Sequence, residues 1–323
     1  MKNVLVEASI ETLRQAIRLK PNSANSHYSL GLIYLNTGEY QAAIECFKTA
    51  IRLRPGEAEG HCRLGLAYEK TGDYQAALEC FEEAKRIYPD HVDTHCGFGL
   101  LYGKKGDYQK EIECYQEAIR LKPDYAIAHY NLGVAYWHTG DTRKEIECYK
   151  EAIRLKPDYV IAHCGLGMAY GKAGEHQKAL ECLKEAARLE PDEAEAQCNL
   201  GRMYGEAGEY QKAMEYFEKT IRLKPTYAEA HNNLGFMYWK TGLSSATPSA
   251  QAGDYKKAIE CYEEAIYIDP ELALAHYNLG VAYEATGDNK KAMACYKEAL
   301  RIQPDYAEAR DKLGKLEGIK QRD

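Results

Sequence analysis

Apolar residues recur at helical spacing in two successive stretches of each 34 residues along most of this chain. The segment from Ala126 to Tyr159 shows the pattern. Its small and apolar positions are Ala128, Leu132, Gly133 and Tyr136 in the first stretch, and Ile146, Tyr149, Ala152 and Ile153 in the second. Gly140-Asp141 interrupts the pattern, and Pro157 follows the second stretch, where its ring and missing N–H end a helix. The spacing therefore predicts two helices, A and B, with a glycine-containing turn between them and a proline-containing turn after them.

The prolines show that this unit repeats. Nine of the ten prolines lie at 21, 55, 89, 123, 157, 191, 225, 270 and 304. Successive members of this series are 34 residues apart, except for 45 residues between Pro225 and Pro270, an interval that contains Pro248. A fixed period of this length predicts a stack of repeated units. Repeats 1 to 8 begin at residues 24, 58, 92, 126, 160, 194, 228 and 273, and positions are numbered from there, leaving residues 243–253 of repeat 7 uncounted.

A Leu-Gly-x-x-Tyr element recurs in helix A. It stands as Leu30-Gly31 with Tyr34, Leu64-Gly65 with Tyr68, Leu132-Gly133 with Tyr136, Leu166-Gly167 with Tyr170, Leu200-Gly201 with Tyr204, Leu234-Gly235 with Tyr238 and Leu279-Gly280 with Tyr283, and repeat 3 has Phe98-Gly99 with Tyr102. Helix B carries recurring alanines and aromatics such as Ala43, Phe47 and Ala50. These residues resemble the tetratricopeptide repeat (TPR) family. The resemblance implies an all-α fold, a right-handed α-solenoid of eight 34-residue helix-turn-helix repeats.

The pattern also predicts the limits of the repeat array. Residues 1–23 match helix B only, an N-terminal half-repeat, and residues 24–306 hold the eight repeats. Residues 307–323 predict a polar C-terminal capping helix. The extra residues 243–253, LSSATPSAQAG, are small and polar, and we expect a mobile loop inserted between the helices of repeat 7. An unpaired helix B at the start leaves an apolar flank that a second copy could cover.

Charge and hydropathy narrow the classes of function. The 323 residues include 42 Lys and Arg against 49 Asp and Glu, a net charge of −7, which argues against a protein that grips nucleic-acid phosphates. No apolar run reaches the roughly 18 residues of a membrane helix, so we expect no membrane insertion. The first residues do not resemble a secretory signal, which makes a cytoplasmic location the default expectation.

One face of helix A is the candidate binding surface. Helical residues advance by about 100° each, so positions 2, 5, 6, 9, 12 and 13 lie together. In the TPR family this face lines a concave wall that binds peptide segments. The only two tryptophans, Trp137 and Trp239, both fall at position 12, where Gly103, Gly171 and Gly205 also stand. We therefore expect indole rings beside hollows that suit a ligand side chain. The alternative is that these rings cover neighbouring helices.

Asparagine at position 6 adds donors and acceptors suited to a peptide backbone. The row resembles that of the TPR superhelix of O-linked N-acetylglucosamine transferases, although only four of eight positions here are Asn, and a surface role without a ligand stays open. The predicted peptide-binding residues are Tyr130, Asn131, Val134, Trp137, His138, Asn199, Arg202, Asn232, Asn233, Phe236, Trp239, Tyr277 and Asn278.

Cysteine and histidine follow the repeat and do not form clusters. The 11 cysteines fall at positions 5 and 23, seven histidines fall at position 4, and no C-x-x-C pair occurs. Equivalent residues of successive repeats lie too far apart for a disulfide. Adjacent residues such as His61 and Cys62 point about 100° apart on a helix and cannot chelate together. We therefore predict packing roles, a reducing compartment, no metal and no cofactor.

These observations favour a non-catalytic scaffold that binds a partner peptide in the concave groove. No set of nucleophile, base and orienting residue occurs outside the repeat pattern, so we predict no enzyme. Two alternatives stay open. One is a self-assembling scaffold that uses the N-terminal half-repeat, and the other is an accessory arm that recruits substrates for a separate enzyme.

Overall fold

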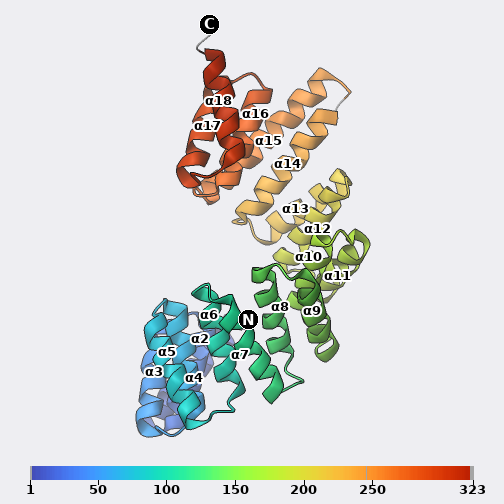
Figure 1. Ribbon diagram of the computed structural model, residues 1–323. Coiled ribbons are helices and arrows are strands. Elements are labelled where there is room, and N and C mark those ends of the chain that lie inside the picture. The colour runs from blue at the N-terminus through green and yellow to red at the C-terminus, as the bar shows by residue number, and fades with distance from the viewer. Residues whose placement is uncertain (1, 245, 321–323) are drawn as a thin grey trace. The chain divides into compact units, whose positions relative to one another are not determined.

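The computed structural model describes residues 2–244 and 246–320, and these residues form helices and short connections without any strand (Figure 1). The all-α fold predicted from the sequence is confirmed. The chain divides into two compact units, residues 1–157 (unit 1) and 158–323 (unit 2).

Unit 1 holds nine of the described helices. They are α1 (Lys2–Leu19), α2 (Ala24–Thr37), α3 (Tyr40–Leu53), α4 (Ala58–Thr71), α5 (Tyr74–Ile87), α6 (Val92–Lys104), α7 (Tyr108–Leu121), α8 (Ala126–Thr139) and α9 (Thr142–Leu155). Unit 2 holds α10 (Val160–Lys172), α11 (His176–Leu189), α12 (Ala194–Glu206), α13 (Tyr210–Leu223), α14 (Ala228–Ser244), α15 (Pro248–Ile268), α16 (Ala273–Ala285), α17 (Asn289–Ile302) and α18 (Ala307–Lys320). Each even-numbered helix up to α16 is a helix A, and the next helix is its helix B.

The turn inside a repeat follows from two residue types. Gly72 ends α4 with φ 81°, a left-handed conformation that side chains disfavour, and its N–H bonds back to the last turn of α4. Asp73 then caps α5, because its carboxylate accepts a hydrogen bond from the N–H of Ala76 at 3.1 Å. Glycines end helix A with positive φ in six further repeats. The sequence thus reverses direction within two residues.

The two helices of a repeat pack closely because position 8 has no side chain. A Cβ atom on Gly31 would lie 2.7 Å from Cε1 of Phe47, so only glycine admits the ring. The same contact recurs between Gly99 and Tyr115 in repeat 3. The helix B alanines Ala43 and Ala77 are fully buried beside these rings. Residues of both helices therefore form a run of small apolar cores along each unit.

Histidine at position 4 ties each repeat to the proline turn before it. The Nε2 atom of His27 lies 3.0 Å from the carbonyl oxygen of Pro21, and His95 makes the same contact to Pro89 at 2.8 Å. In repeat 6, Gln197 takes this place and its Nε2 donates to the Pro191 carbonyl at 3.1 Å. The side chain satisfies a backbone acceptor that the proline turn leaves unpaired. The packing role predicted for these histidines thus includes a hydrogen bond to the preceding turn.

Helix α1 packs its apolar side chains on the first repeat. Ile10, Leu13 and Ile17 lie against the core formed by α2 and α3 and stay partly exposed. The remaining described side chains of residues 6–19 are mostly exposed and polar, apart from the exposed Leu19. The apolar flank expected to receive a second copy therefore stays a prediction.

The prediction of a mobile loop at residues 243–253 is wrong. Helix α14 continues to Ser244 and α15 begins at Pro248, so most of the extra residues lengthen the two helices. Thr247 caps α15 by accepting from the N–H of Ala250 at 3.3 Å, and Pro248 takes the first helical turn. Neither Gly242 nor Gly253 has the positive φ of the other turn glycines. The turn of repeat 7 therefore lies next to the Thr247 cap and not at Gly242 or Gly253.

Candidate functional site

Successive A helices contact one another within each unit. In unit 1, α4 contacts α2 and α6, and in unit 2, α12 contacts α10 and α14, while α14 also contacts α16. We call the face of these helices that carries positions 2, 5, 6, 9, 12 and 13 the inner wall.

An apolar stripe runs along the inner wall on α8. Ile127 is 43% exposed and Trp137 is 55% exposed, and Tyr130 and Val134 lie half-buried between them. The Tyr130 ring is fixed from behind by Tyr149, 5.5 Å away between ring centres. These residues recur every three or four positions, so they form a continuous surface along one helix. Trp137 is the large aromatic side chain of this surface that is exposed to solvent.

His138 and Glu111 form a polar pair beside this stripe. The Nδ1 atom of His138 lies 3.1 Å from Oε2 of Glu111, and the imidazole stacks on Tyr108 with ring centres 4.6 Å apart. Glu111 is almost fully buried. Burial raises the pKa of this carboxyl, and the hydrogen bond from His138 offsets part of the rise. His138 is therefore held in place, half-buried, next to Trp137.

The hollows expected at position 12 are filled. A Cβ atom on Gly103 would lie 2.7 Å from Oε1 of Glu111, and one on Gly171 would lie 2.9 Å from Sδ of Met203. Met237 fills the space at Gly205 in the same way. The glycines admit other side chains of the protein, so the expectation of open hollows beside the indole rings is wrong.

The aromatic residues of unit 2 are more deeply packed. Phe236 and Trp239 stack with ring centres 5.7 Å apart, and Nζ of Lys240 lies 5.2 Å and 5.4 Å from them. Trp239 packs against the core of Tyr262 and Leu279, and its buried indole N–H has no hydrogen-bond partner among the described residues. The alternative that position 12 covers neighbouring helices thus fits Trp239 better than Trp137.

The asparagines of unit 2 bind one another. Nδ2 of Asn278 donates to Oδ1 of Asn232 at 2.9 Å, and Nδ2 of Asn232 donates to Oδ1 of Asn233 at 3.3 Å. Burial raises the pKa of the neighbouring Cys198 thiol to about 11. The asparagine hydrogen bonds link α14 and α16. The amide groups that the sequence assigns to a peptide backbone are therefore largely engaged within the wall.

The remaining predicted residues are dispersed. Asn199 and Asn232 are buried, and Arg202 is exposed on α12. Asn131 is half-buried on α8, and Tyr277 is held between Tyr296 and Tyr306. Five predicted residues thus lie together on α8 of unit 1, and eight lie on three helices of unit 2.

Sequence reasoning missed a charged network in repeats 1 to 3. Oε1 of Glu59 accepts from Tyr28 at 2.9 Å and from Nε of Arg63 at 2.7 Å, and Oε2 lies 2.9 Å from Nε2 of His91. Arg63 also donates to Asp93 at 2.7 Å. The hydrogen bond from His91 is the largest influence that holds the pKa of Glu59 at about 2. Charged residues at positions 2 and 6 of neighbouring repeats were the available signal.

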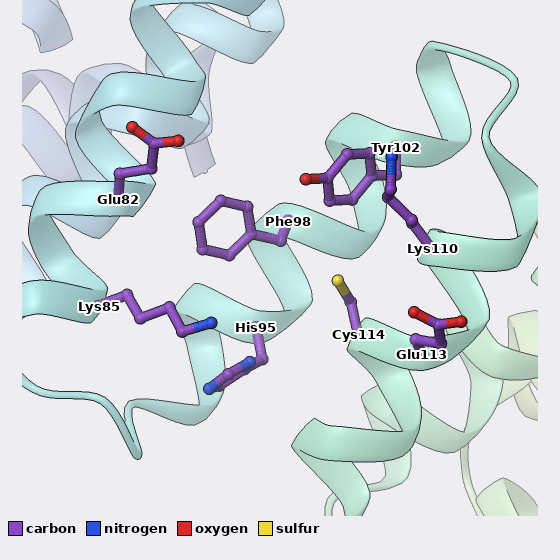
Figure 2. A pocket seen from close by; sticks show the side chains of 8 residues that line it. All are labelled: Glu82, Lys85, His95, Phe98, Tyr102, Lys110, Glu113 and Cys114. Carbon is purple, nitrogen blue, oxygen red and sulfur yellow. The ribbon is translucent and has the colours of Figure 1, made fainter.

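A hollow of about 310 Å³ lies among α5, α6 and α7. Figure 2 shows Phe98 and Cys114 inside it, Lys85 and His95 toward one end, and Tyr102 and Lys110 toward the other. Lysines and glutamates line it in equal number. A hollow of the same volume lies among α13, α14 and α15 of unit 2. We therefore assign this feature to the furrow between stacked repeats, where Phe98 replaces the usual leucine.

The cysteine side chains are all partly or fully buried. All eleven cysteines are free thiols, four of them buried. Burial raises the pKa of Cys62 and Cys164 to about 12 and that of Cys114 to about 11, so these thiols are protonated and weakly nucleophilic near neutral pH. No group of three metal-ligating side chains occurs among residues 2–244 and 246–320. Every helix described is too short or too polar to cross a membrane.

Family models of the tetratricopeptide repeat cover most of the chain. A TPR repeat model matches residues 6–38, 99–140 and 250–287, and further tetratricopeptide repeat models match 31–92, 126–159, 158–226 and 273–306. The chain belongs to the tetratricopeptide repeat family. TPR proteins generally act as protein-interaction scaffolds, and their fold is typically non-catalytic. A comparison with curated protein sequences gives no match.

Solved TPR structures resemble this chain in fold. The APC/C hetero-tetramer Cut9-Hcn1 matches with a TM-score of 0.68 and 17% identity over 89% of this chain and 55% of that one, so this TPR chain spans about half the length of its match. The human IFIT1 dimer with PPP-AAAA matches with a TM-score of 0.58 and 16% identity over 91% and 71% of the chains. MamA is 30% identical over 57% of this chain and 94% of its own, with a TM-score of 0.44.

Proposed function

We propose that this TPR protein is a non-catalytic scaffold that binds a peptide segment of a partner protein on the inner wall, with its main contact on α8. The exposed indole of Trp137 carries the proposal. It stands with Ile127, Tyr130 and Val134 on one helix face, and exposed apolar surface of this kind is buried favourably by a partner. The rings of Phe236 and Trp239 in unit 2 are a second, more enclosed contact surface.

The area of the Trp137 side chain that a partner would bury sets the expected affinity. Burying the exposed half of an indole, on the order of 100 Å², contributes about 2–3 kcal/mol before the costs of association. A stripe of four such side chains therefore supports binding in the micromolar range or weaker. Polar contacts from Asn131 on α8 would add orientation more than affinity.

Selection of a displayed peptide library on the full chain tests the proposal. Selected peptides should shift the emission of Trp137, measured in a Trp239→Phe background. Trp137→Ala should weaken their binding by about thirty-fold, which corresponds to the ~2 kcal/mol of a hot-spot residue. Tyr267→Ala is the matched control, because Tyr267 is an exposed aromatic on a B helix. Peptides that bind equally well to the Trp137→Ala and Phe236→Ala variants would overturn the inner-wall assignment.

A further inference from the structure

Two repeats carry a buried acid where the others carry alanine. Position 20 is a fully buried alanine in six repeats, at Ala43, Ala77, Ala179, Ala213, Ala258 and Ala292. Repeats 3 and 4 have Glu111 and Glu145 there, and Glu111 is 4% exposed. Exchanging a methyl group for a buried carboxylate is unfavourable for folding, because the charge loses its water. A role outside packing would account for it.

The Glu111 carboxylate is directed at the inner wall. Its Oε1 lies 2.7 Å from where a Cβ atom of Gly103 would stand, and Gly103 occupies position 12, one of the inner-wall positions of α6. Oε2 is paired with His138 at 3.1 Å. No described residue donates a hydrogen bond to Oε1, and no described lysine or arginine lies within ion-pair distance of Glu111. A nearly buried carboxylate thus has an acceptor without a partner among the described residues, and the ring of its partner His138 lies 5.1 Å from that of Trp137.

A second acid continues the row in the neighbouring repeat. Glu69, at position 12 of α4, is 5% exposed, and its Oε2 has no hydrogen bond although Nζ of Lys70 lies 3.2 Å away. Burial raises the pKa of the Tyr115 hydroxyl, and the charges of Glu111 and Glu69 add to the rise. Repeats 2 and 3 thus each hold a nearly buried carboxylate, Glu69 and Glu111, and repeat 4 holds the exposed indole of Trp137.

We propose that this row on unit 1 binds a basic side chain, the ammonium or guanidinium group of a lysine or arginine in the partner segment. The cation would lie over the exposed face of Trp137 and donate to Oε1 of Glu111. An indole face attracts a cation, and a hydrogen bond between charged groups is stronger than a neutral one. The inference rests on the proposed function, because it names the chemistry of the peptide bound at α8.

A variant can remove the acid and keep the packing. In repeats 5 and 6 the glycine at position 12 is filled by a methionine at position 10 of the next repeat, Met203 or Met237. Around Gly103 the equivalent residue is Ala135, and Glu111 fills the space instead. The double variant Glu111→Ala with Ala135→Met therefore rebuilds the arrangement of the later repeats. Glu113→Ala is the matched control, because it removes an exposed acid from the same helix.

The test titrates the isotope-labelled full chain with Nα-acetyl-arginine methylamide and Nα-acetyl-norleucine methylamide at low salt. The indole N–H signals of the two tryptophans are followed by NMR, with Trp239→Phe for assignment. We expect the arginine probe to shift the Trp137 signal with a dissociation constant at least about threefold lower than that of the norleucine probe. The difference should vanish in the double variant and at high salt, and persist in Glu113→Ala.

The other outcomes separate the two proposals. Equal responses to the two probes, or an arginine preference that survives in the double variant, would overturn the cation site and leave the apolar stripe as a binding surface. A Trp137 signal that responds to neither probe, together with failure of the peptide selection, would overturn the proposed function on α8 as well.

Discussion

Glu59 shows how a single inner-wall residue is bound by its neighbours. Its two carboxylate oxygens contact Tyr28, Arg63 and His91 from three different repeats or turns. These contacts favour the ionised form, and the hydrogen bond from His91 is the strongest cause of a pKa of about 2 against an ordinary 4.5. The folded protein therefore stabilises the ionised Glu59 side chain relative to its protonated form.

The pH dependence of stability follows from this shift. A depressed pKa in the folded state contributes stability above the unfolded pKa, and that contribution is lost as the pH falls from about 4.5 toward 2. Glu59→Gln should therefore lower the thermal midpoint at pH 6 and flatten its decline in acid. Differential scanning calorimetry between pH 6 and 2.5 measures both effects. Glu147→Gln, which alters an exposed ion pair in the same unit, should leave the slope as it is, and identical slopes in all three proteins would contradict the assignment.

The side chains that the sequence placed correctly are those whose role lies within one repeat. The repeat spacing alone predicts a packing role for His27, and the recurring Gly31 and Phe47 meet inside repeat 1. The failures involve two repeats at once. The space at Gly103 could be assigned only by comparing position 12 of one repeat with position 10 of the next, where methionine or alanine decides which side chain fills it. The mutual hydrogen bonds of Asn232 and Asn278 have the same origin.

At the scale of elements, the prediction for residues 243–253 failed because a local cap determines where α15 begins. Small and polar residues at 243–253 indicated a loop, yet α14 has 17 residues and α15 has 21, against 13 or 14 in the A and B helices of the other repeats. Alanine and glutamine after Pro248 are good helix formers. A Cβ atom on Gly242 would lie 2.8 Å from Cε1 of Tyr255, so the glycine lets the Tyr255 ring pack closely. The insertion thus extends a helical hairpin.

The cap of α15 can be tested on its own. Thr247→Ala removes the acceptor for the N–H of Ala250, and the first turn should lose about 1 kcal/mol of local stability. We expect faster amide exchange at residues 250–252 and an unchanged thermal midpoint, because this turn is exposed and far from the cores. Thr247→Ser is the control, since serine keeps the acceptor. Unaltered exchange in Thr247→Ala would show that another contact holds the turn.

At the scale of the whole molecule, the two units are separate arrays of neighbouring contacts. Within a unit, each helix pair packs mainly on the next pair, so the stability of a unit is close to a sum of repeat and interface contributions. Each unit also contains one tryptophan, Trp137 in unit 1 and Trp239 in unit 2. The chain therefore carries one fluorescence probe for each unit.

Damage to one core should unfold its own unit first. Phe217 is 1% exposed and fills the contact with Gly201, so Phe217→Ala should cost unit 2 about 3–5 kcal/mol. In urea, the Trp239 transition, followed in a Trp137→Phe background, should move to lower concentration by more than the Trp137 transition followed in a Trp239→Phe background. Phe81→Ala, the equivalent change in unit 1, should reverse the order. If both probes shifted equally in both variants, the two units would unfold as one cooperative body.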